Sequence, residues 1–198
     1  LAPESVAELS SSWGLLSGAL ADGQGVSRIF TSLLLHENAV HCVLALYFLW
    51  VFGDNVEDAF GLLFFPLLCL GCVVAGAVGE ALGDPHSFRA SVGAGSLGTG
   101  LMGAYLVLFP AARMRMTIWL LAGPVSIVEM PGLFFCLYWM VAELALYGLS
   151  GVYIPWYARL GAFLFGAACG ATFRLTVLPA WRRGLARTAR NAASQRSP

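Results

Sequence analysis

The chain has 198 residues, of which 59% are hydrophobic and 11% are charged. Eleven basic residues balance eleven acidic ones, so the formal net charge is zero. Because this composition leaves too little polar surface to cover a soluble globule of this length, the sequence predicts an integral membrane protein.

The first 35 residues come before the long apolar stretches. They contain an apolar patch, residues 13–20, that is too short to cross a bilayer and lacks the basic flank of a signal peptide. We expect residues 1–35 to form an outward-facing segment that includes a short amphipathic helix.

Five apolar stretches follow, each long enough or nearly long enough for a bilayer, which needs about 20 helical residues. We expect helices near residues 36–53, 59–82, 92–110, 131–149 and 155–177. Polar connectors such as residues 53–58 separate them. Residues 117–128 are apolar but short and are interrupted by Gly123 and Pro124, so we interpret them as an interfacial or re-entrant segment. The predicted fold class is an all-α integral membrane protein with about five transmembrane helices.

The distribution of arginine predicts the orientation in the membrane. All eleven basic residues are arginine, and several lie in residues 179–198. Arg113 and Arg115 fall on the same side as this tail, whereas Arg28 and Arg89 fall on the other. We therefore predict a multi-pass protein of a bacterial inner membrane or an organelle membrane, with residues 179–198 as a basic cytoplasmic tail beside anionic lipid. The tail is short, and nucleic-acid binding has no support.

Several short motifs occur at separate places along the chain. The sequence LWVFGDNVED at residues 49–58 includes Glu57, and Arg28 comes eight residues before His36, which His41 follows. Three further motifs are GAYLVLFP at 103–110, VEMP at 128–131 and ARLGAFLFG at 158–166. Together they resemble the LWIFGDNVED, WR…HxxxxH, serine-helix, VExP and AHxxGxxxG motifs of the rhomboid intramembrane serine proteases. The resemblance covers roughly residues 27–178. It implies a rhomboid-like helical bundle over residues 36–178, with the family's first span missing from this chain.

The resemblance also assigns the catalytic positions. The nucleophile position is Gly95, and the adjacent hydroxyl, on Ser96, is rotated by about 100° around the helix. The base position is Arg159, whose guanidinium stays protonated and accepts no proton. The position of the oxyanion-stabilising asparagine is Ala45, which has no side-chain donor. Of the family's polar set, His41 remains. We therefore expect an inactive pseudoprotease with no catalytic residue, metal or cofactor.

The two histidines leave other interpretations open. A shifted dyad of Ser96 with His36 or His41 would give an active protease. Alternatively, both histidines are polar groups at a helix end that bond to backbone or water. A zinc site is disfavoured, because ligands on one helical face lie three or four residues apart and these lie five apart.

An arginine a few residues inside a membrane span needs a partner or access to water. Glu143 lies near the end of the preceding span, so a helical hairpin brings it to the depth of Arg159. We expect an ion pair between these residues that closes the former catalytic cavity. Glu37 is the alternative anion, and snorkelling of Arg159 to the outer headgroups is the alternative without a partner.

Small residues predict where helices pack closely. Glycines recur on two of the spans, at Gly93, Gly95, Gly98, Gly100 and Gly103 and again at Gly161, Gly166 and Gly170. Because they let backbones approach, we expect these two helices to meet at the centre of the bundle.

If a protein keeps this fold and does not catalyse the reaction, its remaining function is to bind other molecules. We expect a membrane protein that binds the transmembrane helices of partners, as a structural or assembly subunit of a hetero-oligomeric complex. The alternatives are a protease with Ser96 as a shifted nucleophile and a free-standing pseudoprotease chaperone of membrane clients.

Overall fold

The computed structural model describes residues 3–120, 123–150 and 154–194. The N-terminal elements are α1 (Pro3–Trp13), β1 (Leu15–Leu16), α2 (Ser17–Ala21), α3 (Arg28–Thr31) and the 3₁₀ turn η1 (Ser32–Leu34). The bundle consists of α4 (Ala39–Gly83), β2 (Ala90–Ser91), α5 (Gly95–Leu108), β3 (Arg113–Leu120), β4 (Gly123–Pro131), α6 (Gly132–Ser150) and α7 (Trp156–Ser194). The described chain is therefore mostly helical.

Two of the described helical stretches, α4 and residues Trp156–Val177 of α7, are long and apolar enough to cross a membrane. Two shorter apolar helices, Gly95–Leu108 and Gly132–Glu143, lie beside them. Large apolar side chains point outward from the bundle, including Trp50 at 70% exposure and Leu62 at 80%. Such a surface is suited to hydrocarbon and not to water.

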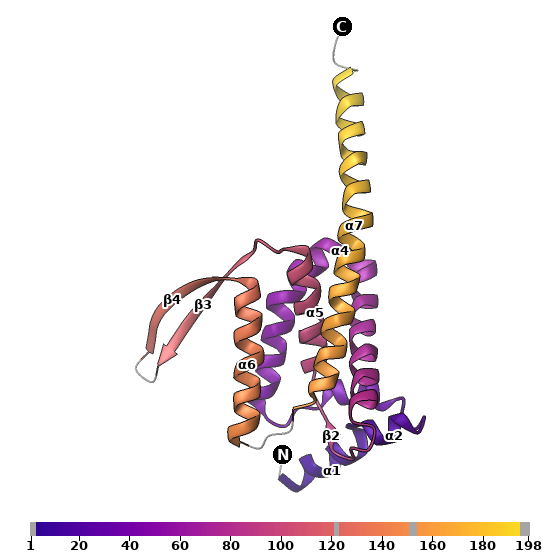
Figure 1. Ribbon diagram of the computed structural model, residues 1–198, viewed down its shortest axis with the longest axis vertical. Coiled ribbons are helices and arrows are strands. Elements are labelled where there is room, and N and C mark those ends of the chain that lie inside the picture. Colours follow the sequence, from indigo (N-terminus) through magenta and orange to yellow (C-terminus); the bar gives the residue numbers. More distant parts are fainter. Residues whose placement is uncertain (1–2, 121–122, 151–153, 195–198) are drawn as a thin grey trace.

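Helix α4 is two legs joined at Gly61, where φ is 77° and ψ is 163°. A positive φ of this size is accessible to glycine and strained for other residues. The legs run in opposite directions, because His41 near the start and Glu80 near the end both lie at the end of the bundle where α5 and α7 begin (Figure 1). The predicted connector at residues 53–58 is wrong: the first leg stays helical through Phe60, with its polar residues at the exposed end of the leg.

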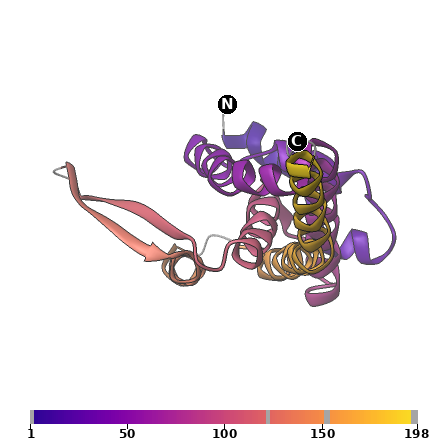
Figure 2. The same cartoon turned by 90° about the horizontal axis from the view of Figure 1, so that it is seen from above.

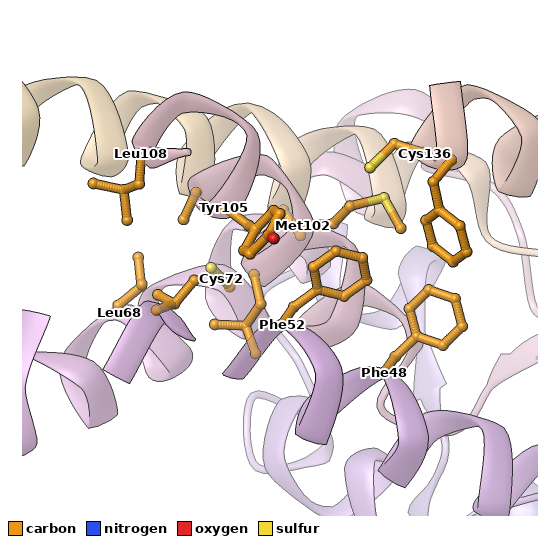
Figure 3. Packing of buried hydrophobic residues seen from close by; sticks show 13 residues of the cluster. Phe48, Phe52, Leu68, Cys72, Met102, Tyr105, Leu108 and Cys136 are labelled. Atoms are coloured by element: carbon orange, nitrogen blue, oxygen red, sulfur yellow. The ribbon is translucent and has the colours of Figure 1, made fainter. Parts of the chain in front are cut away.

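Helix α5 packs against the second leg of α4 and against α7, which also contact each other directly at Gly79 and Gly161. A Cβ atom at Gly100 would touch Cys72, and one at Gly170 would lie 2.9 Å from the carbonyl oxygen of Ala104. Similarly, Gly166 lies against the backbone of Gly100. The contacts of Gly166 and Gly170 form the close α5–α7 approach that the glycine pattern predicts, whereas Gly100 also lies against Cys72 of α4. Figure 3 shows the buried core beside them, made by Phe48, Phe52, Leu68, Cys72, Met102, Tyr105, Leu108 and Cys136.

Strands β3 and β4 form an antiparallel hairpin that runs from Arg113↔Pro131 to Leu120↔Gly123. The hairpin projects away from the bundle beyond α6 (Figures 1 and 2). Residues 117–128, expected as an interfacial or re-entrant segment of an all-α fold, belong to these strands outside residues 121–122. The all-α expectation is therefore wrong here, because we gave too little weight to the alternation of polar and apolar residues from Arg113 onward.

The N-terminal segment lies across the end of the bundle opposite the extension of α7 (Figure 1). Leu15 of β1 pairs with Ser91 of β2, and Ser17 Oγ donates to the carbonyl oxygen of Asp84 at 2.8 Å. At the other end, α7 continues past residue 177 as one helix to Ser194, so the predicted tail is helical over its described part.

Candidate functional site

A cavity of about 310 Å³ lies at the end of the bundle beneath the N-terminal segment. Its wall combines that segment with the first turns of α4, α5 and α7 and with one face of α6. Most lining residues are apolar, and the charged ones are Glu37, Glu143 and Arg159. The cavity therefore brings together the predicted polar positions from four separate parts of the chain.

An ion pair joins α7 to α6 at this cavity. Arg159 Nη1 lies 2.5 Å from Oε1 of Glu143, and the two side chains are 14% and 11% exposed. Trp139, one turn before Glu143 on the same face of α6, donates from Nε1 to the same oxygen at 2.9 Å. The predicted pairing of Arg159 with Glu143 is present, whereas Glu37 is exposed. Arg159 is held inside the bundle and does not snorkel.

The guanidinium group of Arg159 occupies the space above Gly95. A Cβ atom at Gly95 would lie 3.1 Å from Nη2 and 3.3 Å from Cζ of Arg159. This is tighter than ordinary van der Waals contact, so a side chain at Gly95 and the observed position of Arg159 compete for one volume. The predicted nucleophile position, Gly95, thus has no side chain, and the permanently charged guanidinium of Arg159 lies against it.

Ser96 points toward the second leg of α4. A Cβ atom at Gly76 would lie 2.9 Å from Cβ and 3.4 Å from Oγ of Ser96. The predicted rotation of about 100° accounts for this direction. Among the described residues, no hydrogen bond links Ser96 Oγ to His36 or His41, although Ser96 and His41 line the same cavity.

The two histidines contact each other at the start of α4. Their ring centroids are 5.2 Å apart in an edge-to-face arrangement, and Asn38 Oδ1 accepts from the backbone N–H of His41 at 2.9 Å. Gly93, with φ of 96°, lies so close that a Cβ atom there would be 2.7 Å from Cε1 of His41. In the described part of the chain, no group of three or more potential ligands could hold a metal.

A smaller cavity of about 80 Å³ also borders the ion pair. Ala45, the predicted oxyanion position, lines it together with Gly98 and Thr99. The side chain of Ala45 offers no donor. Glu143 and Arg159 line both cavities, as do His41, Leu44, Gly95 and Trp139.

Glu80 is a buried acid that our sequence reasoning did not single out. It is 2% exposed, and its Oε2 accepts from the backbone N–H of Ala158 in the first turn of α7 at 2.7 Å. The signal was available, because an acidic residue inside an apolar span is rare unless it has a partner. Glu80 therefore anchors the helix turn that carries Arg159.

Other predicted positions lie away from the cavity. Arg28 Nη1 donates to the carbonyl oxygen of Ser11 at 3.1 Å, which ties α3 to α1. Glu57 lies four residues before the turn at Gly61, at the opposite end of the bundle. Gly103 and Gly166 belong to the α5–α7 contact. These four residues support the fold and do not touch the cavity.

Comparison with known families gives one match. The family model described as Rhomboid domain matches residues 23–176. Comparison with curated proteins and with solved structures gives no match. The match covers the N-terminal segment from residue 23 and nearly all of the apolar bundle.

Proposed function

The chain belongs to the rhomboid family, and we propose that it is a non-catalytic member that binds transmembrane helices of partner proteins. In this proposal it serves as a structural or assembly subunit of a larger hetero-oligomeric membrane complex. The family match and the apolar helices indicate an integral membrane protein. Rhomboid proteins are normally intramembrane serine proteases, so the proposal separates this chain from the family's usual reaction.

One observation carries the proposal: Arg159 lies against Gly95 and is paired with Glu143. Hydrolysis of a peptide bond needs a nucleophile, a base in contact with it and a site that stabilises the oxyanion. Gly95 supplies no hydroxyl, Arg159 accepts no proton, and Ala45 supplies no side-chain donor. Because such groups act as a unit, the loss of all three argues against residual proteolysis.

The second candidate is a protease in which Ser96 has become the nucleophile. The observation in its favour is that Ser96 and His41 line one cavity. A fluorophosphonate probe tests it directly, since the probe labels activated serines. We expect no labelling of the wild-type protein. Labelling that disappears in Ser96→Ala would replace our proposal with this candidate.

The arrangement in the membrane is part of the same proposal. The two legs of α4 together with α5, α6 and α7 supply five crossings, with the extension of α7 in the cytoplasm. The cavity then lies toward the outer surface, and the N-terminal segment, residues 1–35, covers it from outside. Residues 36–178 form the membrane domain, and residues 179–198 contact anionic lipid on the inner side.

Helix binding follows from the surface that the bundle offers. The first leg of α4 exposes Val40, Val43, Leu46 and Trp50 along its outer face. In the bilayer such a face contacts either lipid tails or the helix of another protein, and packing and interhelical hydrogen bonds decide between them. If one partner helix stays bound to this face, the chain is a subunit of a complex. If the helices of different proteins bind here transiently, the chain is a free-standing chaperone.

Purification from native membranes in a mild detergent separates these possibilities. We expect a companion membrane protein at stoichiometric amounts, retained through size-exclusion chromatography. A lone monomer that carries several client proteins in trace amounts would support the chaperone. A lone monomer without any companion would contradict the subunit proposal.

A further inference from the structure

The hairpin of β3 and β4 changes in composition along its length. Its base carries three charged side chains, since Arg115 donates from Nε to Oε1 of Glu129 at 2.6 Å and Arg113 lies beside the same carboxylate. The rest of the hairpin, residues 116–128, contains no charged residue and is largely apolar. Strands whose open edges face water usually carry charges along those edges. The composition therefore indicates a less polar environment beyond the base.

The base of the hairpin is fixed where α5 ends and α6 begins. The backbone N–H of Gly132 donates to the carbonyl oxygen of Ala112 at 2.9 Å. Met114 and Met130 are half-buried and pack against the core of the bundle. Successive residues of a strand face opposite sides, and the arginines on either side of Met114 are 64% and 77% exposed. The base therefore has an apolar side against the core and a charged side that is free.

From this base the hairpin extends outward and back along the bundle. The far ends of its strands lie at a level within the length of α6 and clear of that helix (Figures 1 and 2). Helix α6 exposes the large apolar side chains of Leu133 and Phe134 near the base of the hairpin. In a bilayer such side chains face lipid. The hairpin therefore continues a surface that contacts lipid.

The open edges of the hairpin limit how deep it can lie. The described sheet of β3 and β4 has two strands, so each strand has backbone N–H and C=O groups along one side that no neighbouring strand satisfies. Such groups are strongly destabilising in the hydrocarbon core, whereas headgroups and water satisfy them at the membrane surface. An apolar hairpin with open edges is therefore suited to the interfacial region between water and hydrocarbon.

We propose that the hairpin is a lipid-binding element that places residues 116–128 in the interfacial region of the bilayer and keeps its charged base among the headgroups. Two arginines and one glutamate leave one positive charge at the base, which complements the phosphate groups of the lipids. The element anchors the ends of α5 and α6 at a fixed depth. This inference rests on the proposal that the bundle crosses the membrane and is independent of catalysis and of any protein partner.

Fluorescence quenching by brominated lipids tests the inference with the full-length protein in phosphatidylcholine vesicles. The fluorescent amino acid Anap replaces Leu120 at the far end of β3. In a matched control it replaces Ala111, which is exposed just before the base of the hairpin. A third position, the 58% exposed Leu164 in the apolar part of α7, reports whether the bundle crosses the bilayer. The bromine atoms are carried on the acyl chains, so quenching reports contact with the apolar part of the lipid.

We expect quenching at Leu120 to exceed that at Ala111 about twofold or more. Equal quenching at these two positions, with strong quenching at Leu164, would overturn the inference and leave the membrane arrangement standing. This is the result expected if the hairpin lies in water and pairs with another protein. If Leu164 is not quenched, the bundle does not cross the bilayer, and the proposed arrangement fails together with the inference.

A matched pair of variants tests the polarity around the far end of the hairpin. Val125→Glu and Val125→Gln introduce side chains of nearly the same shape that differ in charge. Because a charge is costly beside lipid tails, we expect Val125→Glu to reduce quenching at Leu120 about twofold and Val125→Gln to change it much less. Equal quenching in the two variants would show that the hairpin lies in water, which would overturn the inference. The comparison of Leu120 with Ala111 in the chain with Val125 intact tests the inference even if these variants do not fold.

Discussion

Glu80, near the end of α4, accepts a hydrogen bond from the backbone N–H of Ala158 in the first turn of α7, with Oε2 and N 2.7 Å apart. The first N–H groups of a helix have no partner inside it, and a carboxylate is favoured there by the helix dipole. The contact connects residues 78 positions apart in the chain. It sets the position of the turn that carries Arg159, and through it the geometry of the whole cavity.

The anchoring role of Glu80 predicts a clear difference between two substitutions. Glu80→Ala leaves the buried N–H of Ala158 without its acceptor, and we expect the free energy of unfolding to fall by about 1–3 kcal/mol. Glu80→Gln keeps a carbonyl oxygen at the same place, so its loss should be smaller. Thermal unfolding in detergent measures both. Equal destabilisation by the two variants would contradict the role of the hydrogen bond.

The ion pair between Arg159 and Glu143 predicts strong coupling between two substitutions. Arg159→Met or Glu143→Leu alone leaves a charge in a nearly buried position, and each should reduce the free energy of unfolding by about 3–5 kcal/mol. The combination removes both charges and should cost much less than either alone. A double-mutant cycle in denaturant measures the coupling. Additive effects would mean that the two side chains do not stabilise each other and that each is solvated independently.

This pair also illustrates what the sequence could predict about the site. Arg159 and Glu143 were matched by depth in a helical hairpin, an estimate that depends only on the rise per residue of an α-helix. The direction of Ser96 followed in the same way from the angle per residue. The contact of Glu80 was not predicted. Glu80 accepts from the backbone N–H of Ala158, 78 positions away in the chain, and no local sequence pattern indicates such a contact.

The fold was predictable to a similar degree. Apolar runs located the helical segments, because the length of a run and its lack of charge are local properties. The turn between the legs of α4 was placed at residues 53–58 instead of Gly61, since polar residues at an exposed helix end resemble a loop. The strands around residues 117–128 were missed because their apolar content outweighed their alternation in our interpretation.

The contact of Arg159 with Gly95 predicts the outcome of attempts to restore the reaction. Gly95→Ser alone should not react with a fluorophosphonate probe, since the guanidinium still faces the new hydroxyl and accepts no proton. Arg159→His alone should not react either, because it adds a base without a nucleophile. The combined variant places an alcohol opposite an imidazole, and we expect weak labelling, limited by the missing donor at Ala45.

The matched control for this experiment is Gly95→Ala combined with Arg159→His, which has nearly the same bulk and no hydroxyl. It should remain unlabelled, so that any signal in the serine version reports the new alcohol. Labelling of Gly95→Ser with Arg159 intact would contradict our interpretation, because Arg159 would then not prevent activation of a serine at this position.

The close approach of α5 and α7 predicts that Gly166 tolerates no side chain. At Gly166 a Cβ atom would overlap the backbone of Gly100, which cannot rotate out of the way as a side chain can. We expect Gly166→Ala to force the helices apart and lower the free energy of unfolding by several kcal/mol, about 3 or more.

Gly132→Ala is the control. It lies at the start of α6, and its Cβ would have no neighbour nearer than 3.6 Å. Its effect should be within about 1 kcal/mol, and thermal unfolding of the two variants side by side measures the difference. If Gly166→Ala proved as mild as the control, α5 and α7 would not be packed as closely as these contacts imply.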